Sequence, residues 1–262
     1  MSSSPARPGP FWLTLAVVTG LYLLFLLALL AATATYTTPA KFFDAFSSRE
    51  IRYSIVLSLA TCTLSALLAL AIAVPVGYVL SRGQFRGRAL LDAAFDIPVV
   101  LPPMVVGLCL LIFFQTRAGH LIEKATPFTY TVAGVVLAQL VIAAAFAIRT
   151  MRGTFDHLSS RPEDVAMTLG CSRGRAVWLV TLPAAKRGMF AAFSIAWARS
   201  LGEFGPVLVF AGATRMKTEV LPTTVWLELS VGNLEAAVAV SLLMVLLAMV
   251  VLVIVRVTGE RV

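Results

Sequence analysis

Long apolar segments without a charged residue constrain the fold of this chain more than any other feature. Five segments of 20 residues or more lack Asp, Glu, Lys and Arg, and a sixth is interrupted only by Arg199 and Glu203. A helix of about 20 residues, rising roughly 1.5 Å per residue, crosses the hydrocarbon core of a bilayer. The sequence therefore predicts six transmembrane segments, at residues 11–34, 53–81, 97–116, 125–148, 188–213 and 236–255.

The composition and the pattern of these segments favour helices. Apolar residues make up 59% of the chain, charged residues only 13%, and the mean hydropathy is +0.92, whereas a soluble domain carries about twice that charge. Backbone polar groups in lipid must be hydrogen-bonded within the protein, which leaves helices or a closed barrel. Because the apolar runs are continuous rather than alternating, the sequence predicts an all-α polytopic membrane protein with six transmembrane helices.

The third segment contains prolines that interrupt helical hydrogen bonding. Pro98, Pro102 and Pro103 lie in its first half, where missing N–H groups kink or break a helix. Breaks at membrane depth are tolerated only against protein or a water-filled cavity. Pro102 and Pro103 are therefore candidates for lining a transport pathway, although a kink that only improves helix packing explains the same residues.

The distribution of basic residues predicts the orientation of the chain. With the N-terminus in the cytoplasm, thirteen of the 21 Lys and Arg residues lie on the cytoplasmic side, seven lie on the opposite side and Arg199 lies within a span. Because cytoplasmic loops carry excess Lys and Arg, both termini are predicted to be cytoplasmic. The net charge of +8 is then explained by the basic cytoplasmic loops, and no nucleic-acid partner is expected. Residues 32–34 resemble a signal-peptide cleavage site, but the apolar run before them is longer than a signal core, which favours a retained helix.

The cytoplasmic segment 149–187 has the pattern of two short helices joined by a glycine turn. Residues 159–164, Ser-Ser-Arg-Pro-Glu-Asp, supply capping groups, a first-turn proline and two carboxylates for the positive end of a helix. Gly170 suits the left-handed residue that ends such a helix. A second helix is predicted to start at a Ser172 cap and to run to Pro183.

The same segment carries landmarks at fixed spacing: Asp164-Val165-Ala166, three residues, Gly170, nine residues and Val180-x-Leu182-Pro183. This arrangement resembles the EAA loop of ABC importer permeases, where Glu-Ala-Ala, Gly and Ile-x-Leu-Pro have the same spacing. The first acid here is Asp instead of Glu, and two apolar residues differ. Glu163, one residue earlier, is a second source for the carboxylate.

Other stretches of the sequence resemble one group of ABC importer permeases more specifically. Residues 97–107, 198–205, 210–212 and 218–222 are similar to the permeases for molybdate, tungstate and sulfate. The similarity covers roughly residues 53–255, and it leaves the first helix as an addition to a five-helix core.

The resemblance implies the permease subunit of an ATP-driven importer in the inner, plasma membrane, carrying molybdate or tungstate, with sulfate as a further candidate. Residues 1–50 would form an N-terminal transmembrane helix and external loop, and residues 51–262 the permease domain with a coupling loop at about 149–187. The implied partners are a cytoplasmic ABC ATPase dimer that binds ATP and Mg²⁺, an extracytoplasmic substrate-binding protein, a second copy of this chain and membrane lipid. The residues implied in coupling to the ATPase are Glu163, Asp164, Ala166, Gly170, Leu182 and Pro183.

Arg199 and Glu203 are the charged residues of the fifth predicted segment. They are four residues apart, so they share a helix face and can pair, close to the bilayer midplane, where charges usually face a cavity or the bundle interior. One interpretation is a gate on the anion path, together with Ser200, Gly202 and the prolines of the third segment. A structural ion pair is the other, because Glu203 cancels the field that would attract an anion.

Rival functions need features that the sequence lacks. Residues 170–174 match G-x-S-x-G, but no strand-to-helix elbow is predicted there. No G-x-x-x-x-G-K-[ST] loop occurs, so ATP hydrolysis is assigned to a separate subunit, and no catalytic residue, cofactor or metal site is predicted in this chain, whose only histidines are His120 and His157. A secondary transporter or channel without an ATPase is the remaining alternative, although it needs more intramembrane ionisable residues for ion coupling.

Overall fold

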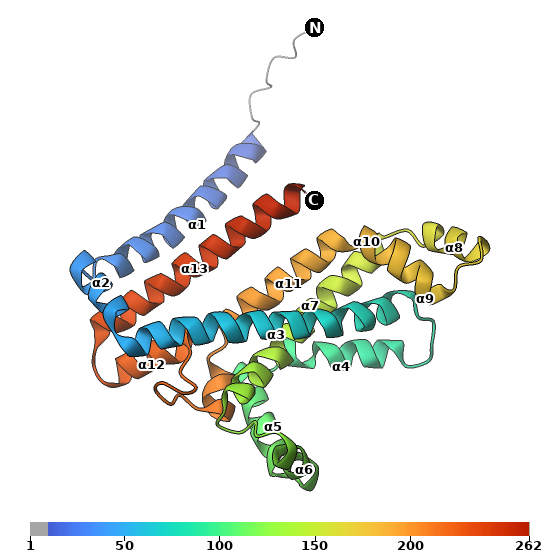
Figure 1. The fold of residues 1–262 in the computed structure, drawn as a ribbon. Coiled ribbons are helices and arrows are strands. Elements are labelled where there is room, and N and C mark those ends of the chain that lie inside the picture. Colours follow the sequence, from blue (N-terminus) through green and yellow to red (C-terminus); the bar gives the residue numbers. More distant parts are fainter. Residues whose placement is uncertain (1–9, 262) are drawn as a thin grey trace.

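The computed structural model describes residues 10–261, and within that range every regular element is helical (Figure 1). The α-helical elements are α1 (Pro10–Ala34), α2 (Pro39–Ser47), α3 (Arg49–Arg82), α4 (Arg88–Val100), α5 (Pro103–Gln115), α6 (Arg117–Ala125), α7 (Val132–His157), α8 (Arg161–Thr168), α9 (Arg173–Ala176), α10 (Leu182–Ala184), α11 (Lys186–Leu201), α12 (Leu221–Ser230) and α13 (Leu234–Arg261). Two π-helical segments, η1 (Val177–Thr181) and η2 (Val207–Ala211), complete the set. The predicted all-α fold is confirmed.

The core lies between α3, α7 and α11. Small residues on the facing sides of α3 and α7, among them Ala69, Ala73 and Ala147, are fully buried. A side chain at Gly77 would come within 2.9 Å of the Arg152 backbone nitrogen, so only glycine permits this approach of α3 to α7. Small residues let transmembrane helices approach closely, which gains van der Waals contact where lipid offers no hydrophobic driving force.

The predicted six spans are not confirmed as six continuous helices. Within the described residues, α1, α3, α7 and α13 are long and apolar enough to cross a bilayer, and the bent pair α4 and α5 brings the number to five. The segment 188–213 is not one helix, because α11 ends at Leu201 and the chain continues through a non-helical break to η2. Pro206 lies at the start of η2 and has no N–H to continue the α11 ladder across that break.

The third predicted segment is broken, as its prolines indicate. Helix α4 ends at Val100, α5 begins at Pro103, and their axes differ by 110°. Leu101 is extended, the conformation that a following proline favours. Pro98 lies inside α4 without ending it. The break therefore comes from Pro102 and Pro103.

The fourth span begins later and ends later than predicted. Helix α7 starts at Val132, where the Thr131 hydroxyl accepts a hydrogen bond from the Gly134 nitrogen at 3.2 Å, and it continues to His157. Its last turns therefore carry the arginines of the cytoplasmic segment beyond the apolar run.

Helix α1 stands apart from the core. Its side chains are almost all exposed, and it contacts the rest of the protein mainly along α13. Figure 1 shows α1 and α13 running in opposite directions, so that the start of α1 and the end of α13 lie on the same side of the molecule. The exposed apolar surface of α1 is the surface expected of a helix that faces lipid.

Candidate functional site

The segment after α7 forms the predicted helix, turn and helix. Helix α8 begins after Ser160, and the Arg161 nitrogen donates a hydrogen bond to the Ser159 hydroxyl at 3.3 Å. Gly170 has a φ of +91°, which confirms the predicted left-handed turn. The Gly170 nitrogen bonds the Met167 carbonyl and the Cys171 nitrogen bonds the Ala166 carbonyl, so the free carbonyls at the helix end are satisfied.

The second helix is continuous but not uniform. It begins as α9 after Ser172, whose backbone carbonyl accepts from the Ala176 nitrogen at 2.9 Å, while its side chain makes no capping hydrogen bond. It then passes through η1 into α10, where Leu182 packs against the core and Pro183 is exposed. The predicted end at Leu-Pro is confirmed, and the π turn was not foreseen.

The two adjacent acids of α8 have different surroundings. Glu163 is 5% exposed, and its two carboxylate oxygens accept hydrogen bonds from the Tyr78 hydroxyl at 2.5 Å and the Thr181 hydroxyl at 2.9 Å. Asp164 is exposed, and Ala166 is half-buried. Tyr78 and Thr181 were not singled out from the sequence, because nothing local to Glu163 indicates partners 85 and 18 residues away.

Large apolar side chains are exposed on the same two helices. Val165 in α8 and Leu169 at its end are 57% and 81% exposed. Trp178 and Leu179 of η1 are 72% and 69% exposed. Contiguous exposed apolar side chains beside polar ones mark interaction surfaces. The exposure of Trp178 and Leu179 was not predicted, because an apolar run inside a helix indicates buried side chains.

A second site lies where the broken spans meet. The predicted pairing of Arg199 with Glu203 is confirmed, with 2.6 Å between Nη2 and Oε1. Glu203 is 2% exposed, whereas the Arg199 side chain is 39% exposed and lies over the Phe146 ring of α7, 5.0 Å from its centroid. Both residues border a cavity of about 260 Å³, lined by Pro103, Met104, Arg199, Gly202, Glu203, Phe204 and Gly205.

This cavity contains most of the predicted gate residues. Pro103, Arg199, Gly202 and Glu203 line it together, although Pro103 lies about a hundred residues away in the sequence. Ser200 is fully buried outside the lining, and so does not face the cavity.

Pro102 and the two glycines also have distinct positions. Pro102 is exposed at the start of α5. A side chain at Gly205 would lie 2.9 Å from Met104, so Gly205 lets the break after α11 approach α5. Among the described residues, Gly202 has no such close neighbour, and its role in the gate stays a prediction.

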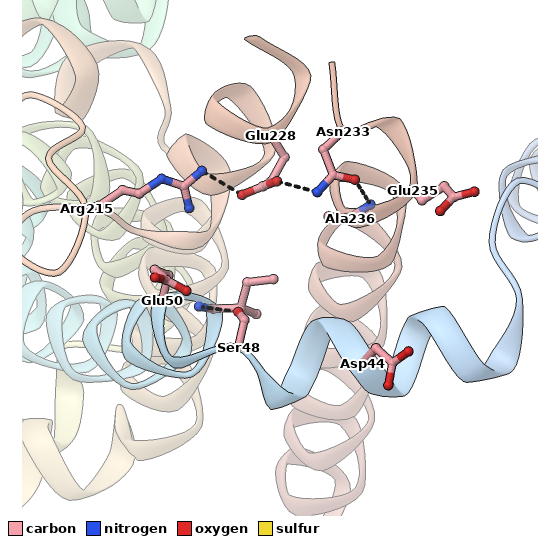
Figure 2. Close-up of a pocket in the computed structure, with 9 residues that line it drawn as sticks. Asp44, Ser48, Glu50, Arg215, Glu228, Asn233, Glu235 and Ala236 are labelled. Carbon is pink, nitrogen blue, oxygen red and sulfur yellow. Dashed lines mark hydrogen bonds and ion pairs between the residues drawn. The ribbon is translucent and has the colours of Figure 1, made fainter. Parts of the chain in front are cut away.

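A polar pocket lies at the opposite end of the molecule from the α8 loop, where α2, α3, α12 and α13 meet. Figure 2 shows Arg215 facing Glu228, with 2.8 Å between Nη2 and Oε1, and Asn233 donating to the other Glu228 oxygen at 2.9 Å. The hydrogen bond that Arg215 donates to Glu228 raises the pKa of Arg215. Asp44, Glu50 and Glu235 line the same pocket, of about 400 Å³. Arg215 is one of the seven basic residues assigned to the external side. It is therefore paired with carboxylates of this chain.

Comparison with known proteins identifies relatives along most of the chain. Residues 70–262 match the family described as "Binding-protein-dependent transport system inner membrane component". The chain is 35% identical to the probable molybdenum ABC transporter permease protein of Haloferax volcanii, over 94% of this chain and 89% of that protein. It is 28% identical to the sulfate transport system permease protein CysT of Salmonella typhimurium, over 92% and 89%.

A solved structure shares the fold. A chain of the bacterial alginate ABC transporter, in complex with an alginate pentasaccharide-bound periplasmic protein, superposes with a TM-score of 0.75 at 16% identity, covering 95% of this chain and 94% of that one. At this identity the likeness concerns the fold alone.

Proposed function

Because the chain belongs to the binding-protein-dependent transport system inner membrane component family, we propose that it is the permease subunit of an ATP-driven importer of molybdate or tungstate. The observation that carries this proposal is the α8 loop. It has the EAA spacing and the left-handed Gly170, and it presents Asp164, Val165 and Leu169 outward on one short helix. A compact amphipathic helix of this kind suits a groove on a partner protein.

The proposed assembly contains two copies of this chain, two cytoplasmic ATPase subunits and an extracytoplasmic substrate-binding protein. ATP and Mg²⁺ bind the ATPase subunits, and this chain contributes a pathway and no catalytic group. Both termini lie in the cytoplasm, an arrangement supported by the positive-inside bias and by the antiparallel α1 and α13. Residues 51–262 form the permease core, and residues 1–50 add a transmembrane helix to it.

The cavity beside Arg199 is proposed as part of the anion path. Its single arginine is paired with Glu203, so the site carries little net charge with which to hold a dianion. Such a cavity suits passage better than storage, because tight binding would slow release. Selection of the anion is assigned to the substrate-binding protein, and alternating access opens the cavity to each side in turn.

The identity of the substrate is supported by the relatives. The relative named for molybdenum is more similar to this chain than the one named for sulfate, at 35% against 28% identity over nearly the same span. Molybdate and tungstate are tetrahedral dianions of similar size, so one passage suits both.

The test is reconstitution. The chain, co-expressed with its cognate ATPase and purified, is placed in proteoliposomes with the binding protein outside and ATP inside, and molybdate uptake is measured. ATP-dependent uptake that excess unlabelled molybdate or tungstate competes away more strongly than sulfate is expected. Uptake driven by an ion gradient without ATP, or failure of any ATPase to co-purify, would favour the secondary transporter or channel instead.

A further inference from the structure

Glu163 joins three elements that are separate in the sequence. It lies in the first turn of α8, its Oε1 accepts from Tyr78 on α3, and its Oε2 accepts from Thr181 on η1. Hydrogen bonds to a buried, ionised carboxylate are among the stronger polar contacts in proteins. Arg82 and Arg173 line the same polar pocket as Glu163.

The end of α3 makes further contacts with the chain that leads into α8. Arg82 Nη2 donates to the Leu158 carbonyl at 2.5 Å, and the Ser81 hydroxyl donates to Asp156 Oδ1 at 2.6 Å. Tyr78, Ser81 and Arg82 therefore contact residues after, before and within the α7–α8 connection, respectively.

The covalent connection between α7 and α8 is short and not helical. It consists of residues 158–160, in which Leu158 is extended. A non-helical connection of this kind can bend when α8 is pushed, so that the displacement is lost before it reaches α7. The hydrogen bonds of Glu163 bypass this connection and link α8 directly to α3, which packs along α7 in the core.

The neighbouring acid is accessible. Asp164 lines the same polar pocket as Glu163, but its side chain is exposed, as are those of Val165 and Leu169, which the proposed function assigns to the ATPase contact. Resting on that proposed function, we propose that Glu163 is a positioning residue that makes the coupling helix move with α3, while Asp164 alone of the two acids contacts the ATPase. Movement of α3 then reaches the anion cavity through α7, whose Phe146 lies under Arg199.

Two near-isosteric substitutions test this role without opening a cavity. Tyr78→Phe and Thr181→Val each remove one hydroxyl that donates to Glu163. Tyr53→Phe is the matched control, because it removes one tyrosine hydroxyl bond, to the Lys217 carbonyl at 3.2 Å, at the other end of the same helix. Thr150→Val is the second control, since its hydroxyl donates to the Phe146 carbonyl within the same helix, α7.

The measurement is anion imported per ATP hydrolysed by the reconstituted complex, together with ATPase co-purification and thermal unfolding. We expect Tyr78→Phe and Thr181→Val each to lower this ratio about tenfold, the factor that corresponds to the loss of one hydrogen bond to a charged group, with the ATPase still co-purifying. The double variant should lose more than the product of the two, since it leaves the carboxylate buried without a hydroxyl donor. Both controls should keep the wild-type ratio.

Wild-type ratios in Tyr78→Phe and Thr181→Val, or equal losses in Tyr53→Phe, overturn the role of Glu163 while leaving the proposed function intact. Loss of ATPase co-purification in Tyr78→Phe also overturns it, because Glu163 would then act on docking. Absence of ATP-driven uptake by the wild-type complex overturns the proposed function itself, so the two failures are distinguishable.

Discussion

The α8 loop and the segment around Arg199 both place a buried carboxylate beside apolar surface, but the partners differ in kind. Glu163 is bonded to residues of two other elements, whereas Glu203 pairs with an arginine four positions earlier. Arg215 and Glu219, in the connection between η2 and α12, form a second pair of this spacing at 3.8 Å, although Arg215 lies closer to Glu228 of α12, at 2.8 Å. A long-range bond makes two elements move together, while a local pair neutralises a charge in place. The first arrangement suits transmission of movement and the second suits a passage.

The largest effect is expected at the turn of the loop. Gly170→Arg puts a non-glycine residue at a φ of +91° and adds a bulky cation to the exposed face. We expect the variant to reach the membrane but to lose transport and substrate-stimulated ATP hydrolysis. Gly170→Ala separates the two causes, because it adds only the backbone strain, about 1 kcal/mol. Normal coupling in Gly170→Arg would remove the loop from the mechanism.

Removing Arg199 or Glu203 should lower the stability of the protein by different amounts. Arg199→Ala leaves Glu203, which is 2% exposed, as an uncompensated buried charge, at a cost of about 3 kcal/mol. Glu203→Ala should cost less, because the Arg199 side chain is 39% exposed to the cavity. Thermal unfolding in detergent tests the order of the two, and vesicle uptake tests the gate. Full uptake by both variants would reduce the pair to a structural role.

The exposed face of α8 should matter for association but not for folding. Leu169 is 81% exposed, so Leu169→Asp should leave the unfolding temperature unchanged while weakening ATPase binding about tenfold, as expected for an apolar interface residue. Leu121→Asp is the control, since Leu121 is 70% exposed on α6, outside the loop. Quantitative co-purification of the ATPase measures both. Equal binding by the two variants would place the docking surface elsewhere.

The smallest effect concerns the second local pair. Burial raises the pKa of Glu219, with Glu228 and Glu50 adding to the shift and Arg215 opposing it. A carboxyl whose pKa is higher in the folded chain stabilises the fold below its unfolded pKa, and this contribution is lost as the pH rises through the folded pKa. Glu219→Gln should therefore unfold at a higher temperature than the wild type near neutral pH, with a gain that shrinks on acidification. A gain independent of pH would contradict this explanation.

Local features of the candidate sites were predictable because their causes are local. The break at Pro102, the left-handed Gly170 and the pairing of Arg199 with Glu203 each depend on residues within one turn of one another. The interruption of the segment 188–213 was missed, because an apolar run indicates burial or lipid contact without showing whether its helix is continuous.

The sequence by itself determined that this chain is an all-α membrane protein and where its loop turns, since apolar length, proline and glycine act through short-range backbone physics. Only the tertiary structure decided which of two adjacent acids is buried and which proline lines a cavity with Arg199. Those outcomes depend on contacts between residues far apart in the sequence, such as Tyr78 with Glu163. Packing between different helices brings these residues together, and no local sequence pattern predicts it.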